Sequence, residues 1–130
     1  MTKDIYTIIT DKLNANPRFK ALVADRMKIY DYPASKSKTP LFVLIYPMEP
    51  PSPGQAGSDG SLSVQFYFQV NVEGTNRHDV KEVAAIVRDT MSGFNFGQLS
   101  TGLDEYFPET NRFVDARRYR GVTQLYDNNY

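Results

Sequence analysis

The 130-residue sequence contains no cysteine. This absence excludes disulfide bonds, thiolate catalysis and cysteine-ligated zinc, and it suits a reducing compartment such as the cytosol. Histidine occurs only once, and no Gly-rich phosphate loop, GxSxG motif or HExxH motif is present. We therefore expect no catalytic site, no metal site and no cofactor.

The sequence also lacks a long hydrophobic run and a net charge. The longest apolar run, Leu41 to Tyr46, is far shorter than the roughly 20 residues that span a bilayer, and the N-terminus resembles an amphipathic helix rather than a signal peptide. Lys and Arg number 15, as do Asp and Glu, whereas a general nucleic-acid binder normally has a basic excess. We expect no membrane partner and no general binding of nucleic acid.

Length and composition predict one soluble globular domain over residues 1–130. The chain is 41% hydrophobic and 23% charged, which is far from the composition of disordered proteins. A domain of this length buries about two-thirds of the surface of its unfolded chain. One hydrophobic core is therefore sufficient to hold it.

Two stretches have the spacing of amphipathic helices, and a short helix is expected between them where Asn16 and Pro17 can form its cap and first turn. The apolar positions are Ile5, Ile8, Ile9 and Leu13 in the first stretch and Val80, Val83, Ala84, Val87 and Met91 in the second. This spacing predicts two main helices, each with one apolar face.

Four segments have the character of β-strands: 27–30, 41–46, 62–72 and 111–122. The segment 62–72 alternates apolar and polar residues without exception, which is a strong strand pattern. Residues 94–108 show no period and are expected to form a loop or a short turn of helix. The element order predicts an α+β fold, with an antiparallel or mixed β-sheet of about four strands flanked by two main helices.

A segment rich in proline and glycine, residues 47–61, separates two of these strands. Prolines remove backbone donors and glycines loosen the chain, so the composition predicts neither strand nor helix but a long loop that projects from the sheet. A polar tail is expected at 126–130. The candidate docking residues of the loop are Pro50, Pro51, Pro53, Gly54, Gly57 and Asp59.

The polar face of the 62–72 strand carries no charge. A solvated sheet face usually includes Lys or Glu, whereas the cores of protein interfaces are depleted of charge and enriched in tyrosine. The face is therefore expected either to meet a partner or to be covered by helices of the same chain. Its candidate partner-binding residues are Gln65, Tyr67, Gln69 and Asn71.

The last strand contains Arg117, Arg118 and Arg120 around Tyr119, a combination that could hold phosphate or stack on bases. Because side chains alternate along a strand, Arg118 and Arg120 share one face, whereas Arg117 lies on the other. The cluster is thus divided, and Asp115 lies beside it. We favour arginines that form ion pairs within or between subunits over arginines that bind DNA.

The single histidine, His78, lies at the expected start of the second main helix beside Asp79 and Glu82. Carboxylates in the first turns of a helix interact favourably with its dipole and need no catalytic role. A catalytic triad or metal site needs further residues that the pattern does not identify. We expect an exposed histidine, and a small hydrolase that depends on His78 is the disfavoured alternative.

The whole chain nevertheless resembles a known family. The N-terminal helix, "NPRFKALVADRMKIYDYPASKSKTPLFVLIYP", the long loop, the alternating strand, "NRHDVKEVAAIVRDTM" and "ETNRFVDARRYRG" look like the tail-terminator family of long-tailed bacteriophages. The sequence is similar to small tail components of phages and prophages of Gram-positive bacteria, and more distantly to the lambda tail terminator.

This resemblance implies a non-enzymatic virion protein. Family members assemble in the host bacterial cytoplasm as a ring, typically a hexamer, at the head-proximal end of the tail. The ring stops polymerisation of the tail-tube protein, presents a surface to a neck or head-completion protein, and lets DNA cross its channel without sequence-specific binding. The alternatives are another neck or head-completion connector, or a nucleic-acid-binding module that uses Arg117, Arg118 and Arg120.

Overall fold

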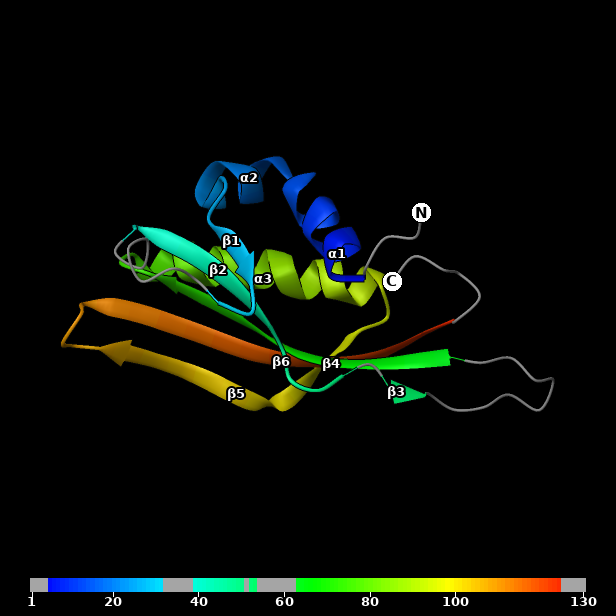
Figure 1. The fold of residues 1–130 in the computed structure, drawn as a ribbon. Helices are drawn as coiled ribbons and strands as arrows, with labels where there is room; N and C mark the ends of the chain where they lie inside the picture. The colour runs from blue at the N-terminus through cyan, green and yellow to red at the C-terminus, as the bar shows by residue number, and fades with distance from the viewer. Residues whose placement is uncertain (1–4, 32–38, 51, 54–62, 125–130) are drawn as a thin grey trace.

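The computed structural model describes residues 5–31, 39–50, 52–53 and 63–124. For residues 52, 53, 63, 123 and 124 it describes the backbone only. The elements follow the chain in the order α1 (Ile5–Asn14), α2 (Pro17–Val23), β1 (Met27–Ile29), β2 (Leu41–Pro47), β3 (Ser52–Pro53), β4 (Ser63–Gly74), α3 (Arg77–Gly93), β5 (Gly97–Phe107) and β6 (Arg112–Gln124). Figure 1 shows the helices gathered on one side of a single twisted sheet.

The strands of the described residues are ordered β1-β2-β4-β6-β5, and the short β3 pairs with β4 beyond the end of β2. Strand β1 runs parallel to β2, and the other pairs are antiparallel. The predicted α+β class with a mixed sheet is therefore confirmed. The sheet has one more long strand than the sequence indicated.

The core lies between the sheet and the helices, where the apolar faces predicted from periodicity meet. Phe66, Phe68, Val70 and Val72 of β4 are all at most 3% exposed, so the alternation over 62–72 set the register as expected. All five predicted apolar positions of α3 are buried as well. In α1 three of the four predicted apolar positions are buried, and the fourth, Ile8, is partly exposed.

Helices α2 and α3 both begin at a capping asparagine, and for α2 this is the predicted Asn16. The side-chain oxygen Oδ1 of Asn16 accepts hydrogen bonds of 3.0 Å from the backbone amides of Arg18 and Phe19, and Pro17 occupies the first turn of α2. Asn76 caps α3 in the same way, through a 3.1 Å bond from the amide of Asp79. These bonds satisfy amides that a helix start leaves without intrahelical partners.

Strand β5 corrects the expectation of a loop or short helical turn at 94–108. It forms an edge of the sheet and is exposed along nearly its whole length, so no apolar alternation marks it in the sequence. Its pairing with β6 is also interrupted, because Gln98 pairs with Tyr119 and Gly102 with Arg117, which leaves residues 99–101 opposite Arg118. Periodicity cannot identify a strand that has no buried face and contains a bulge.

The expectation of neither strand nor helix over 47–61 is wrong for its first part. The amide of Met48 donates to the carbonyl of Tyr67 over 2.9 Å, and Ser52–Pro53 form β3 against Gln65 and Val64 of β4. Backbone pairing along an existing edge needs little help from side-chain propensity. The candidate loop residues Pro51, Gly54, Gly57 and Asp59 and the tail at 126–130 lie outside the described residues.

None of the three helices in the described part of the chain combines the length and the apolar character of a bilayer-spanning helix.

The hydroxyl group of Tyr119 is a polar group buried in this core. Tyr119 is 1% exposed and its ring stacks on Phe68 at 5.9 Å, but its hydroxyl oxygen is buried with no hydrogen-bond partner in the described part of the chain. Burial raises the pKa of Tyr119 to about 12. A buried hydroxyl without a partner costs about 1–3 kcal/mol of desolvation.

We therefore predict that Tyr119→Phe leaves the free energy of unfolding unchanged or raises it by about 1 kcal/mol at pH 7. Because the folded pKa is raised, the wild-type chain loses stability as the pH rises from about 10 to about 12, and the advantage of the variant should grow over that range. Urea unfolding at pH 7 and pH 11 measures both effects. A variant destabilised at both values would mean that the hydroxyl is hydrogen-bonded in the folded protein.

Candidate assembly surface

The sheet has an open face, which is the face turned away from α1, α2 and α3 (Figure 1). On β4 the residues from Gln65 to Glu73 that alternate with the buried ones point to this face, and all five are partly exposed. The register with β6 places Tyr67 opposite Arg120 and Gln69 opposite Arg118. We call the following residues the open-face patch: Gln65, Tyr67, Gln69, Asn71, Arg118 and Arg120.

The side chains of the open-face patch contact one another across the two strands. Nε of Arg118 donates to Oε1 of Gln69 over 2.8 Å, and Nε2 of Gln69 donates to Oδ1 of Asn71 over 2.7 Å. The guanidinium carbon of Arg120 lies 4.7 Å from the ring centroid of Tyr67, a cation–π geometry. Neither arginine forms an ion pair with a carboxylate of the described residues.

Exposed apolar side chains border the open-face patch. The register places Tyr46 beside Gln69 and Val122 beside Gln65, and their exposed fractions are 46% and 45%. Aromatic, arginine and amide side chains beside exposed apolar ones are typical of protein interfaces. Of the two sequence-based alternatives, cover by the chain's own helices is wrong for the described residues, because these helices pack on the opposite face.

The sequence reasoning missed Arg112, which lies at the far end of β6 on the same face. Arg112 is 6% exposed, its Nε donates to Oε2 of Glu73 over 2.7 Å, and its guanidinium carbon lies 5.6 Å from the ring centroid of Phe42. Arg112 is an even number of positions from Arg118 and Arg120, and this spacing could have predicted that all three lie on the same face of the strand. Because Arg112 is buried and paired with a carboxylate of its own subunit, we do not include it in the open-face patch.

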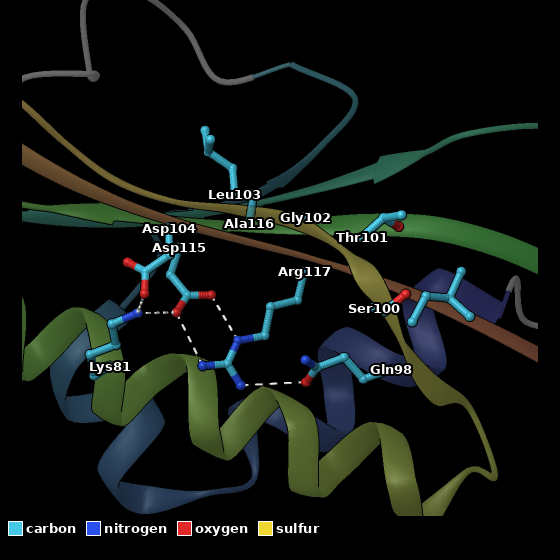
Figure 2. A pocket seen from close by; sticks show the side chains of 11 residues that line it. Lys81, Gln98, Ser100, Thr101, Gly102, Leu103, Asp104, Asp115, Ala116 and Arg117 are labelled. Atoms are coloured by element: carbon cyan, nitrogen blue, oxygen red, sulfur yellow. Dashed lines mark hydrogen bonds and ion pairs between the residues drawn. The ribbon is translucent and has the colours of Figure 1, made fainter.

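Arg117 lies on the helix-covered face, as the alternation predicted, and it forms an ion cluster with α3 (Figure 2). Nε of Arg117 donates to Oδ1 of Asp115 over 2.8 Å, and Nη2 donates to Oδ2 over 3.1 Å. Lys81 of α3 donates to the same carboxylate over 2.8 Å and to Asp104 of β5 over 2.6 Å. The cluster thus joins α3 to both β6 and β5.

Asp115 is the centre of this cluster, with only 3% of its side chain exposed. Burial alone would raise the pKa of Asp115, but the hydrogen bonds from Arg117 and Lys81 outweigh burial and hold the pKa below its usual value. Beside the cluster is a hollow of about 410 Å³, lined by the bulged part of β5. The two cations and two carboxylates of the cluster balance one another, which fits a structural role.

His78 lies where the sequence predicted, exposed at the start of α3. Its Nδ1 is 3.8 Å from a carboxylate oxygen of Asp79, and Glu82 completes a group of possible metal ligands. Glu82 is already bound by Arg18, through contacts of 2.5 and 3.0 Å, and these contacts lower the pKa of Glu82. Carboxylates at a helix start are common without a metal, so we assign no site there.

No protein-family model matches the sequence, and no curated protein matches it significantly. A chain of the solved structure described as "Virion of native gene transfer agent (GTA) particle" is similar in fold, with a TM-score of 0.65. The match covers 89% of this chain and 91% of that chain, with 15% sequence identity. The likeness therefore concerns the fold, and it extends over nearly the whole of both chains.

Proposed function

We propose that this protein is a structural subunit of a virion, and that it acts as a tail terminator. In this role several copies form a ring, of six subunits as in the family that the sequence resembles, that caps the tail tube and stops its polymerisation. The same ring joins the tail to a neck or head-completion protein. Its place is then the head-proximal end of the tail, with assembly in the bacterial cytoplasm.

The observation that carries the proposal is the fold likeness to a chain of a virion particle over about nine-tenths of both chains. The fold likeness agrees with the family resemblance of the sequence, which rests on the order of the sequence segments and not on the three-dimensional structure. Shared fold alone does not imply shared function, so the surface of the subunit must also suit assembly. The open-face patch, with its amide, aromatic and arginine side chains, provides such a surface.

A closed ring of identical subunits needs two different patches on each subunit, because every contact is head-to-tail. We assign the open-face patch to one side of this contact. Arg117 is not part of it, because its guanidinium is bound to Asp115 within the subunit. The balanced charge of the chain suits a channel that lets DNA pass without holding it.

We predict that particles produced without this protein have tails of abnormal length that are not joined to heads. The physical reason is that a tube whose growing end is not capped continues to add subunits. Electron microscopy of particles made with and without the chain measures tail length and head attachment. Supplying the wild-type chain in trans is the control, and it should restore both.

The same experiment separates the tail terminator from another neck connector. Tails of normal length that fail to join heads would favour the connector. Tails of normal length on complete particles would overturn both functions. Binding to DNA that weakens steeply with salt, and is lost in Arg118→Ala/Arg120→Ala, would instead favour a nucleic-acid-binding module.

A further inference from the structure

We infer that the open-face patch binds the acidic β5–β6 hairpin of a second copy of this chain, so that Arg118 and Arg120 meet Glu105 and Glu109 of the neighbouring subunit. This inference rests on the proposed ring and names the two surfaces that close it. The acidic hairpin is defined here as residues 103–109, which are the end of β5 and the start of the turn to β6.

The first step is the unbalanced positive charge of the open-face patch. Among the described residues, Arg118 and Arg120 contact neutral groups, the amide of Gln69 and the ring of Tyr67. Arg18 and Arg112, by contrast, each form an ion pair with a carboxylate of their own chain. Two neighbouring guanidinium groups that have no carboxylate in the described part of the chain can bind one from a second molecule, in charge-assisted hydrogen bonds.

The second step is the unbalanced negative charge of the acidic hairpin. The stretch 97–111 contains Asp104, Glu105 and Glu109 but no lysine or arginine. Asp104 is bound by Lys81, whereas Glu105 and Glu109 are exposed and form no ion pair in the described residues. Leu103, which is 41% exposed, adds an apolar contact beside them.

The third step is the position of the two surfaces along the open face of the sheet, where Asn71 of the patch and Leu103 of the hairpin both pair with Ala116 of β6. Arg120 pairs with Gly97 at the start of β5, whereas Glu105 pairs with Val114 near the other end of the hairpin. Val114 lies six positions from Arg120 along β6, which is about 20 Å, and four positions from Arg118, which is about 13 Å. In Figure 1 the turn between β5 and β6 lies at one tip of the sheet. Within one subunit Glu105 is thus too far from Arg120 to pair with it, and Arg118 donates to Gln69 instead.

A subunit that carries two different and complementary surfaces can join its neighbours head to tail, and head-to-tail contacts are the ones that close a ring. Phosphate groups of DNA could also pair with the arginines, but DNA would leave the acidic hairpin and its exposed leucine without a partner. A second copy satisfies both surfaces at once. We therefore choose the second copy as the partner, and DNA becomes an outcome of the test.

The test uses two charge-reversed variants of the full chain, Arg118→Glu/Arg120→Glu and Glu105→Lys/Glu109→Lys. Each alone places like charges across the contact, so we expect its self-association to weaken by about 100-fold or more. A mixture of the two restores opposite charges at every contact if the variants alternate around an even-numbered ring. Analytical ultracentrifugation of each variant and of the mixture should show assembly only in the mixture.

The matched control is Lys20→Glu/Arg77→Glu, which reverses two exposed charges on the helical side and should assemble like the wild type. Circular dichroism checks that each variant is folded. Because the chain has no cysteine, cross-linking gives a second readout for contacts too weak to sediment. Arg120→Cys mixed with Glu105→Cys should form mixed disulfide dimers far faster than Lys20→Cys mixed with Glu105→Cys.

Reversed variants that assemble as the wild type does, or equal rates for the two cysteine mixtures, would overturn the inferred contact. If those variants still cap tails of normal length, the proposed function stands and only the contact is wrong. If complete particles with normal tails form without the protein, the proposed function itself fails. Loss of salt-dependent DNA binding in Arg118→Glu/Arg120→Glu, without any change in assembly, would assign the arginines to DNA.

Discussion

Replacing Gly121 with alanine is expected to lower the free energy of unfolding by about 3 kcal/mol. A methyl group at this position would lie 1.8 Å from Cδ1 of Phe96, a distance that no relaxation of the methyl alone can relieve. The Phe96 ring is 1% exposed and packs edge-on against Phe68 at 5.7 Å. Urea unfolding should show the loss, and the melting temperature should fall by roughly 10 °C.

Gly93→Ala is the matched control, because a methyl group there would meet no atom within 4 Å. It lies at the end of α3, and its effect should stay within about 0.5 kcal/mol. Combining Gly121→Ala with Phe96→Leu removes the ring that collides, so the double variant should lose less stability than the sum of the single ones. Additive losses would show that the ring is not the cause.

The sequence determines the helices and the central strands of this fold because each has one buried and one solvated face. Periodicity reports that difference directly, as in β4, where Phe66 and Phe68 alternate with Tyr67 and Gln69. Strand β5 was not predicted, because an edge strand with both faces exposed has no such pattern. The pairing of Ser52–Pro53 with β4 was not predicted either. It depends on backbone groups, which every residue carries, so no side-chain pattern marks it.

The candidate surface was predictable in part for the same reason. Alternation alone separated Arg117 from Arg118 and Arg120. It could not show that β6 lies beside β4, because strand order is decided by packing between distant segments. That neighbourhood brings Arg118 to Gln69 and Arg120 to Tyr67, so two surfaces that the sequence suggested separately are one. The acidic hairpin includes the end of β5, so it could not be predicted from the sequence either.

Asp115→Ala is expected to lower the free energy of unfolding by about 3 kcal/mol at pH 7. The carboxylate accepts three hydrogen bonds, two from Arg117 and one from Lys81. Its removal leaves the charges of Lys81 and Arg117 partly buried beside each other without their shared partner. Solvent reaches both cations, so the loss should lie at the lower end of the range for broken buried ion pairs. Urea unfolding measures it.

Asp104→Ala is the control, because it removes a carboxylate bound to the same lysine at 2.6 Å, but one whose side chain is 68% exposed. Its loss should stay below about 1 kcal/mol. The pKa of Asp115 is lowered by folding, so its contribution is fully present above its unfolded value of about 4 and disappears as the pH falls through the folded value. The difference between wild type and Asp115→Ala should therefore be constant from about pH 5 to pH 8 and shrink below about pH 4. A difference that stayed constant down to pH 2 would show that the lost stability comes from packing of the side chain and not from its charge.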